Sequence, residues 1–496
     1  MTAKTEHRQR PARAGRPRTG IEIHLDSRWS LGAKMTQGGF GEIFEAASVD
    51  GQVAVVKLIP KVPGAQRELL FDLPDAPNVL PSIDRGDWGD YWVLVMPRAT
   101  TSLQQRLRER QGSLPEVEAV AVLRDIANGL TAMSGKVVHR DLKPANILLW
   151  EGRWCIADFG IARYAEATTA PDTRKRAMTS AYAAPEQWRL ERATEATDVY
   201  AMGVLGFELI EGRLPFPGPT AEEFRDQHLY GQPSGFKQAS PPLQALLSEC
   251  LLKQPQARPT ARAIADRLQH ITEPASGGLA RLQQAYSLQV ALDLVEQTKR
   301  AREADEEARR RGLYASAEQV FASLIGRFED AVRRGAPSAK IERRGGLSLD
   351  LGQARLTLEP LKRNTFGLPN RTQPGFEVIA NSKISITYTQ PRGSWVGRSH
   401  SLWYSNAVDR AAYRLLELAF MAIFTKEIRP IEPFALDPNE DAFLALSPVM
   451  HTYQSAWNFT PVDQGEEGAF IDRWLGWFAD AAAGSLQRPS VLPERR

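Results

Sequence analysis

The chain has 496 residues, of which 43% are hydrophobic and 24% are charged, and its formal net charge is +3. This length exceeds that of one ordinary domain, so two or three domains are expected. The composition is that of a globular protein and excludes a fibrous or wholly disordered chain. Because the charge is nearly balanced, the composition gives no reason to expect nucleic acid as the main partner.

The start of the chain carries much of the excess positive charge. Six basic side chains stand against one acidic side chain in the first twenty residues, among Pro, Gly and few apolar residues. This composition predicts a basic, disordered tail over residues 1–26. One interpretation is an electrostatic contact with nucleic acid, a membrane surface or an acidic partner. A solvated tail without a specific partner is the commoner outcome and the one that we favour.

The cysteines and the apolar stretches indicate in which cellular compartment the protein is expected. Cys155 and Cys250 stand in neither a paired nor a metal-binding spacing. No apolar stretch follows the basic start, as a secretory signal would require. The longest apolar stretches, near 199–210 and 411–424, contain charged residues and are too short to span a membrane. We therefore expect a reduced, soluble, cytoplasmic protein without a membrane span.

Strands come first along the chain and helices follow. Residues 27–45 are typical of a strand, a glycine turn and a second strand, and residues 53–57 and 91–96 of buried strands. A short amphipathic helix is predicted over residues 65–73. Apolar residues at spacings of three and four predict a longer helix over residues 117–133.

The second half begins with a break in this pattern. Residues 271–280 contain Pro, Ser and Gly and indicate a linker. Residues 281–334 predict one or two long helices, which we interpret as a helical linker because residues 299–311 are nearly all charged. A coiled-coil partner helix is the alternative, although no sustained heptad is visible.

A separate α+β domain with an antiparallel sheet is predicted over residues 345–485, before a tail at residues 486–496. Alternating apolar residues predict strands in LSLDLG, QARLTLEP, GFEVIANSKISITYTQ and SHSLWY. Amphipathic helices are predicted over residues 408–424 and 466–482.

Two longer motifs in the first half carry chemistry. The string VVHRDLKPANILL occupies residues 137–149, and ADFG follows at 157–160. Four shorter motifs accompany them: TQGGFG at 36–41, VAVVK at 53–57, APE at 184–186 and QARP at 256–259. Through this specific set, residues 27–272 resemble the Hanks-type serine/threonine protein kinases of bacteria. The resemblance implies a two-lobed α+β kinase fold, the use of ATP and Mg²⁺, and protein substrates with Ser or Thr.

The glycine-rich run suits a phosphate. Phosphoryl transfer needs a positioned phosphate, neutralised charge and a nucleophile held in line. Without a Cβ atom, Gly38, Gly39 and Gly41 let backbone N–H groups approach phosphate oxygens. The resemblance implies that Lys57 grips the α- and β-phosphates and that Glu68 holds this lysine.

The resemblance also assigns residues around the adenine ring. Val55 stands where the family usually has alanine, and Met96 falls at the gatekeeper position. Leu148 would pack beneath the ring, and Ile43 completes the predicted ATP-binding set.

For the transfer itself, the resemblance implies four roles. Asp141 would accept the proton of the substrate hydroxyl, and Lys143 would steady the γ-phosphate. Lysine at this position is the mark of the serine/threonine kinases. Asn146 and Asp158 would each hold Mg²⁺, whose charge offsets that of the transferred phosphate.

An activation segment is implied between Asp158 and Glu186. In kinases of this kind, an arginine at the position of Arg140 pairs with a phosphate on this segment. The candidate phosphorylation sites, which we expect the protein to modify itself, are Thr168, Thr169 and Thr173.

Three further contacts follow from the resemblance. Thr179 should touch the catalytic aspartate, Glu186 should form a buried ion pair with Arg258, and Asp198 should support the backbone of the catalytic loop.

The C-terminal half resembles no family. His400 and His451 are isolated and are expected to be core or surface residues rather than ligands. The region is rich in tryptophan, a residue that usually lies in a hydrophobic core. The alternative is that these tryptophans form a ligand cage or anchor a binding partner. These tryptophans are Trp395, Trp403, Trp457, Trp474 and Trp477.

Two functions remain open for the whole chain. In the first, an active kinase carries a C-terminal domain that senses a signal or recruits substrate. In the second, a pseudokinase binds nucleotide and serves as a scaffold; Thr36, in place of a further glycine, and the short separation of Glu68 from Lys57 favour it. A small-molecule kinase is disfavoured, because the APE and QARP elements build a platform for peptides.

Overall fold

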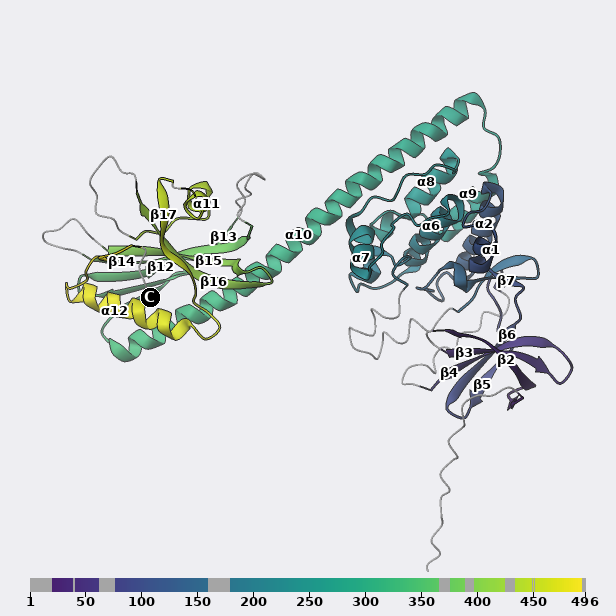
Figure 1. Cartoon of the computed structure of the whole chain (residues 1–496), viewed down its shortest axis with the longest axis horizontal. Helices are drawn as coiled ribbons and strands as arrows, with labels where there is room; N and C mark the ends of the chain where they lie inside the picture. The colour runs from purple at the N-terminus through teal and green to yellow at the C-terminus, as the bar shows by residue number, and fades with distance from the viewer. Residues whose placement is uncertain are drawn as a thin grey trace, which may run out of the picture. The chain divides into compact units, whose positions relative to one another are not determined.

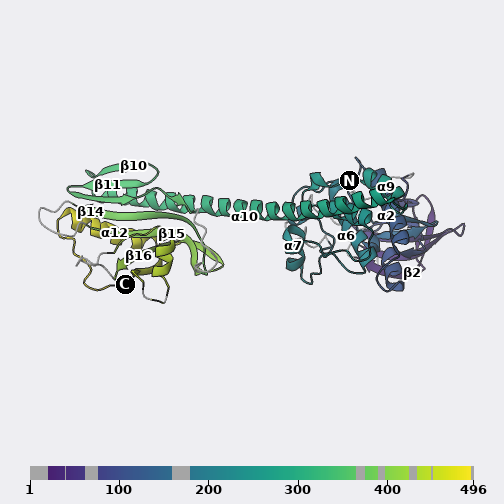
Figure 2. The same cartoon turned by 90° about the horizontal axis from the view of Figure 1, so that it is seen from above.

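The computed structural model of the chain describes residues 20–38, 41–61, 76–158, 179–364, 375–388, 397–423, 433–447, 449 and 451–492. The chain divides into two compact units, Met1–Glu303 and Ala304–Arg496. The boundary between them falls inside one helix, α10 (Gly277–Gly335) (Figures 1 and 2).

A six-stranded antiparallel sheet forms the N-terminal lobe of the first unit, in the order β1-β2-β3-β4-β6-β5. Its strands are β1 (Glu22–His24), β2 (Arg28–Gly38), β3 (Gly41–Ser48), β4 (Val53–Pro60), β5 (Asp84–Trp88) and β6 (Tyr91–Pro97). Along β4, Ala54, Val56 and Leu58 are fully buried in the core of this lobe. Because side chains alternate along a strand, Val55 and Lys57 lie on the opposite face.

The first strand corrects one prediction. Residues 20–26 belong to the fold, because β1 pairs with β2 and Ile23 is fully buried. Asp84 fixes this edge, since its Oδ2 accepts hydrogen bonds from the Trp29 indole N–H at 2.8 Å and the Ser27 amide at 2.9 Å. The predicted tail is therefore too long at its C-terminal end.

Helices build the second lobe of the first unit. They are α1 (Leu103–Glu109), α2 (Glu116–Met133), α5 (Pro185–Trp188), α6 (Glu195–Glu211), α7 (Ala221–Tyr230), α8 (Pro241–Cys250) and α9 (Ala261–His270), with single 3₁₀ turns at Pro144–Asn146 and Pro255–Ala257. β7 (Thr101–Ser102), β8 (Ile147–Trp150) and β9 (Arg153–Ile156) form a small sheet, and the loop that contains Asp141 leads into β8. The helix predicted at 117–133 is confirmed as α2.

Helix α6 lies at the centre of this lobe and is buried on nearly all sides. Gly206 allows α8 to approach it, because a Cβ atom there would lie 2.5 Å from the side chain of Leu247. Because the helices themselves are buried, the candidate site is formed by the loops at their ends.

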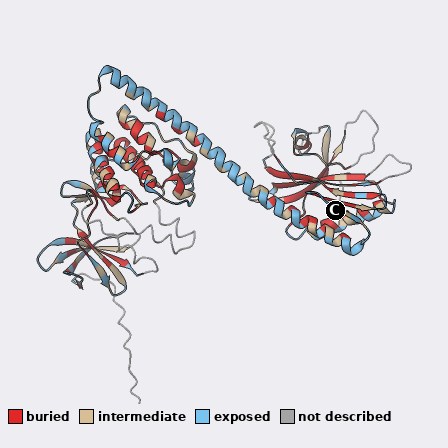
Figure 3. Cartoon of the chain, turned by 180° about the vertical axis from the view of Figure 1, so that it is seen from behind, coloured by how far each residue is buried: buried red, intermediate tan, exposed pale blue. Residues whose placement is uncertain are grey.

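The first part of α10 also belongs to the first unit. The Tyr286 hydroxyl donates to Glu249 at the end of α8, over 2.9 Å. Val290 is buried, whereas Leu288 and Leu292 on another side of the helix are exposed. Most of this part of the helix is exposed (Figure 3). This part of α10 is therefore more than a solvated spacer.

The second unit contains an eight-stranded antiparallel sheet in the order β10-β11-β12-β14-β15-β16-β17, with β13 paired to β14. Its strands are β10 (Lys340–Arg343), β11 (Leu347–Leu351), β12 (Ala354–Leu358), β13 (Lys362–Arg363), β14 (Val378–Tyr388), β15 (Gly397–Asp409), β16 (Ala412–Ala422) and β17 (Tyr453–Pro461). The end of α10 and α12 (Glu467–Ala482) cover one face, and α11 (Glu440–Ala445) lies on the other (Figure 1). The helix predicted at 466–482 and the four predicted strands are confirmed.

The core of the second unit begins earlier than predicted. We expected a helical linker over residues 281–334 and a domain from residue 345. Instead, one face of α10 packs into the sheet core, through Ala317, Phe321, Leu324, Ile325, Phe328 and Val332. The chain end also packs, because Leu486, in the predicted tail, is buried in the same core. The charged run at residues 299–311 led us to interpret the whole helix as a linker. The apolar positions of the helix follow this run, from Ala317 onward.

The helix predicted over residues 408–424 is wrong. The region instead forms the end of β15 and the strand β16. The run from Leu415 to Phe420 is fully buried, because the sheet is covered on both faces there. Such a strand has a nearly continuous apolar sequence, interrupted here by the buried Glu417, and periodicity alone does not distinguish it from a buried helix.

The tryptophans of the second unit are mainly core residues, as predicted. Trp403, Trp457 and Trp474 are at most 5% exposed, and Trp395 lies outside the described residues. His400 is a fully buried core residue whose Nδ1 lies 2.8 Å from Glu417 Oε1. In the part of the chain that the structure describes, no helix has the length and apolar character needed to cross a membrane.

One substitution pair on α10 tests the two environments of this helix. Leu324→Ala removes a side chain that is 1% exposed and should cost about 2–5 kcal/mol of local stability in the second unit. Leu292→Ala, at 56% exposure on the same helix, should change stability by at most about 0.5 kcal/mol. Hydrogen exchange of peptides from β14 to β16 measures the difference. Equal effects of the two variants would contradict the assignment of residues 317–332 to the second core.

Candidate active site

The carboxylate of Asp141 is the centre of a compact polar cluster. Its Oδ2 accepts a hydrogen bond from Lys143 Nζ at 2.5 Å, and its Oδ1 accepts one from the Thr179 hydroxyl at 2.7 Å. Lys143 Nζ also lies 3.0 Å from the Thr179 hydroxyl, and Asn146 Nδ2 donates to the Asp141 carbonyl at 2.9 Å. The predicted contact of Thr179 with Asp141 is thus confirmed.

The backbone before Asp141 is held from inside the helical lobe. The buried carboxylate of Asp198, near the start of α6, accepts the amide N–H groups of His139 and Arg140, both at 2.7 Å. His139 Nε2 lies 3.0 Å from the carbonyl of Ala157, and its Nδ1 accepts the Asp141 amide at 3.2 Å. The predicted support of the loop by Asp198 is confirmed.

An ion pair joins the two lobes. Lys57 Nζ, 4% exposed, lies 2.9 Å from Asp158 Oδ1. Burial by itself would raise the pKa of the Asp158 carboxyl, but the charge and hydrogen bond of Lys57 outweigh burial, with help from His139 and Lys143. The pKa therefore lies below its ordinary value, and Asp158 carries the negative charge that a metal site requires.

The predicted residues around the adenine ring, with Ile43 of the ATP-binding set, come from four strands. Val55 of β4 pairs with Met96 of β6, and Leu148 of β8 packs against the buried cluster that contains Met96. Ile43 of β3 pairs with Lys57 in the neighbouring strand. Val55 thus shares its strand with Lys57, and Ile43 and Met96 lie on the two strands that pair with it.

The glycine run has a structural role in addition to the predicted one. Gly38, the last residue of β2, pairs with Gly41, the first residue of β3. A Cβ atom on Gly41 would lie 2.5 Å from the Leu58 carbonyl oxygen, so glycine also permits the close approach of β3 to β4. Five predicted site residues lie outside the described residues: Gly39, Glu68, Thr168, Thr169 and Thr173.

The residues present suit magnesium. Asn146 Nδ2 donates to the Asp141 carbonyl, which leaves its amide oxygen as the atom available to a cation. With Asp158 it would provide two oxygen ligands, and Mg²⁺ commonly takes its remaining ligands from water and substrate phosphates. Among the described residues, no group of three or more His, Cys, Asp or Glu side chains forms an all-protein metal site.

A buried ion pair anchors the end of the activation segment. Arg258 holds Glu186 through two hydrogen bonds of 2.8 and 2.9 Å, and the Thr197 hydroxyl adds a third at 2.8 Å. Burial by itself would raise the pKa of Glu186, but the hydrogen bonds and charge of Arg258 hold it below its ordinary value of 4.5. The predicted pair is confirmed.

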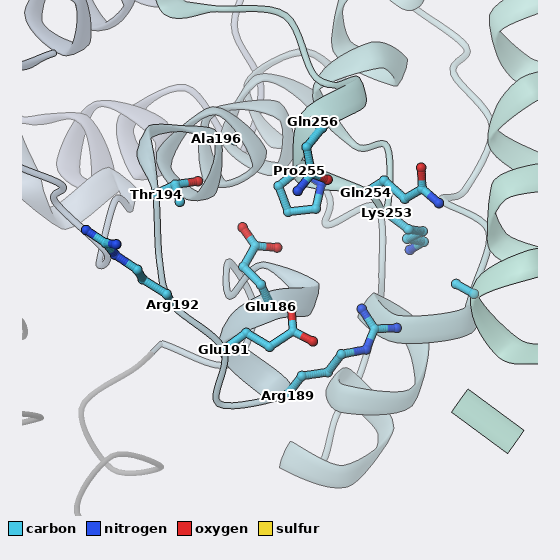
Figure 4. Close-up of a pocket in the computed structure, with 11 residues that line it drawn as sticks. Glu186, Arg189, Glu191, Arg192, Thr194, Ala196, Lys253, Gln254, Pro255 and Gln256 are labelled. Atoms are coloured by element: carbon cyan, nitrogen blue, oxygen red, sulfur yellow. The ribbon is translucent and has the colours of Figure 1, made fainter. Parts of the chain in front are cut away.

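Glu186 of this ion pair lines a cavity of about 440 Å³ (Figure 4). Ala301 of α10 contributes to its wall. Lys253 lines it at 1% exposure and donates to the His228 carbonyl at 2.8 Å. Burial, together with the charges of Arg258 and Arg189, lowers the pKa of Lys253 to about 7. Sequence reasoning missed this lysine, because a lysine before a Gln-Pro pair resembles an ordinary surface residue.

The buried pair of Glu186 and Arg258 should make the stability of the protein depend on pH. Because the pKa of Glu186 is lower in the folded state, its carboxylate contributes stability above pH 4.5, and this contribution is lost as pH falls through the lowered value. Glu186→Gln should lower the free energy of unfolding at pH 7. It should also make the decrease of this free energy between pH 5 and pH 3 smaller than in the wild type. Urea unfolding across this range measures it, with the exposed Glu222→Gln as the control. A Glu186→Gln profile parallel to the wild type would contradict the assignment.

Comparison with known proteins agrees with this geometry. Residues 29–270 match the protein kinase domain model. The serine/threonine-protein kinase PkaA of Streptomyces coelicolor is 37% identical over 213 residues, which cover 42% of this chain and 39% of PkaA. PknL of Mycobacterium tuberculosis is 34% identical over 217 residues, covering 41% and 54%, and PrkC of Bacillus subtilis is 32% identical over 181 residues, covering 36% and 28%.

The chain thus spans about half or less of the length of these relatives. The matched region contains both lobes except β1, and every residue of the cluster around Asp141. Residues 29–270 therefore form a protein kinase domain, and its bacterial relatives are named serine/threonine-protein kinases.

Proposed function

We propose that this protein transfers the γ-phosphate of ATP to serine or threonine hydroxyls of proteins. The observation that carries the proposal is the Asp141 cluster. Lys143, Thr179 and Asn146 all contact Asp141 within 3.3 Å, from the catalytic loop and the far end of the activation segment. A carboxylate fixed in this way can orient a hydroxyl and accept its proton.

The described residues can also meet the other requirements of the reaction, which are phosphate binding and charge neutralisation. Lys57, held by Asp158, would bind the α- and β-phosphates. Asn146 and Asp158 would hold Mg²⁺, which when bound neutralises charge on the phosphate oxygens. Lys143 lies next to the carboxylate of Asp141, where its ammonium group can offset charge on the γ-phosphate.

Protein substrates fit better than small molecules. The end of the activation segment is tied to the helical lobe by Glu186 and Arg258, with side chains that are 2% or less exposed. The Tyr182 hydroxyl donates to Glu208 of α6 at 2.6 Å, on the same stretch. A fixed platform of this kind supports an extended peptide beside Asp141.

An assay with labelled ATP and Mg²⁺ on a generic basic protein tests the activity. Asp141→Asn should lower the rate about 10²- to 10⁴-fold, because the proton acceptor is lost. The matched control is Asp266→Asn on the exposed face of α9, which should keep the wild-type rate. Nucleotide binding without transfer by the wild type would instead support the scaffold function.

We also propose that the protein phosphorylates its own activation segment at Thr168, Thr169 or Thr173. The sequence supports this through Arg174, Lys175 and Arg176 beside Thr173, and through Arg140 in the catalytic loop. Mass spectrometry after incubation with ATP should find phosphate in residues 158–186 of the wild type and none in Asp141→Asn. No phosphate in this segment of an active wild type would contradict it.

For the second unit, we propose recruitment of substrate or sensing of a signal. Its own hydrophobic core, separate from the kinase lobes, supports an independent role. Phosphoproteomics on extracts treated with wild type or Leu324→Ala tests recruitment. The variant should lose a subset of targets while it still phosphorylates the generic protein, and identical target sets would contradict recruitment.

A further inference from the structure

The peptide bond between Arg140 and Asp141 has an unusual setting. Arg140 has a φ of +71°, a backbone conformation that residues with a side chain rarely adopt. The N–H end of this peptide bond is the Asp141 amide, which donates to His139 Nδ1 at 3.2 Å. Its other end, the Arg140 carbonyl, accepts a hydrogen bond from Gln187 Nε2 at 2.9 Å. Both ends of the bond that leads into Asp141 are thus held by side chains.

The side chain of Gln187 is fixed at its other end too. Its Oε1 accepts the backbone N–H of Ala184 at 2.9 Å. Because a backbone N–H only donates and a carbonyl only accepts, the two partners determine which amide atom is oxygen and which is nitrogen. Gln187 therefore bridges the catalytic loop and the turn that starts α5.

That turn is firmly anchored. Ala184 is fully buried at the N-terminal end of α5, and Glu186 in the first turn of the helix forms the buried pair with Arg258. Gln187 thus connects the anchored end of the activation segment to the residue that precedes Asp141.

We propose that Gln187 is a positioning residue for phosphoryl transfer, which sets the plane of the Arg140–Asp141 peptide and through it the direction of the Asp141 carboxylate. The inference rests on the proposed kinase function and extends it to a residue outside the predicted site. Gln187 does not touch the reacting atoms; it acts through the backbone of the catalytic loop.

The contacts of Asp198 do not duplicate this role. Asp198 accepts the amides of His139 and Arg140, which belong to the two preceding peptide bonds. It leaves the Arg140 carbonyl to another donor. A catalytic group must be held to within about 0.5 Å of its productive position, and a displacement of about 1 Å can lower a rate about 100-fold.

The test compares two glutamine-to-glutamate substitutions. In Gln187→Glu, one oxygen can still accept from Ala184, but the second cannot donate to the Arg140 carbonyl while the carboxyl is ionised. Gln244→Glu is the matched control: Gln244 also donates to a backbone carbonyl of the helical lobe, that of Ala239 at 2.7 Å, in a helix away from the site.

We expect kcat of Gln187→Glu to fall about 10- to 100-fold at pH 8. Nucleotide Kd and the thermal midpoint should stay near those of the wild type, and the control should keep its kcat. Protonation of the introduced carboxyl restores a donor. The deficit relative to wild type should therefore shrink as the pH is lowered toward 5.5, which a loss of folding would not produce.

A second readout does not depend on catalysis. Hydrogen exchange over residues 139–142 should accelerate in Gln187→Glu and in Gln187→Ala, but not in the control, because the Asp141 amide is released when its peptide plane turns. Unchanged kcat and unchanged exchange in Gln187→Glu would overturn the inference, as would a deficit that does not change with pH. An inactive wild type with the expected exchange difference would count against the proposed function alone.

Discussion

The helical lobe depends on the buried pairing of Arg258 with Glu186. The guanidinium group has five donor hydrogens, and the structure gives acceptors for its three nitrogens: both Glu186 oxygens and the carbonyls of Leu252, Lys253 and Ala196. A buried charge pair is tolerable only when its hydrogen-bonding groups are satisfied in this way. With Arg258 fixed, the end of the activation segment, the start of α6 and the loop after α8 share one anchor.

From this anchor, fixed contacts extend to the catalytic centre. Glu186 holds the turn of Ala184, Gln187 joins that turn to the carbonyl of Arg140, and Asp141 follows directly. From the other side, Asp198 reaches the same loop from α6. The lobes meet where Lys57 pairs with Asp158. Charge in the site is thus positioned by groups that have little freedom to move, which is what electrostatic stabilisation of a transferred phosphate requires.

How much the sequence predicted depended on the kind of interaction. Contacts between side chains, such as Thr179 with Asp141, were predictable where the resemblance to the serine/threonine kinases implies both partners. The role of Gln187 was not, since one of its partners is a backbone carbonyl and the other a backbone amide, and neither leaves a trace in the sequence. Lys253 was missed because burial follows from tertiary packing. The strand β16 was predicted as a helix because burial on both faces removes the alternation that identifies strands.

Helix α10 has a consequence for how such a chain can be recombined. Residues up to 303 belong to the first unit and those from 304 onward to the second, within one uninterrupted helix. If the C-terminal part were replaced from residue 272 onward, where the kinase motifs end, the first unit would lose Val290 and Ala301. The buried position of Val290 and the cavity wall at Ala301 would then have to be filled by the replacing sequence. An exchange at residue 345 would separate Phe328 from the sheet that buries it. A junction that leaves both cores complete must therefore be made inside the helix, between Ala301 and Ala317.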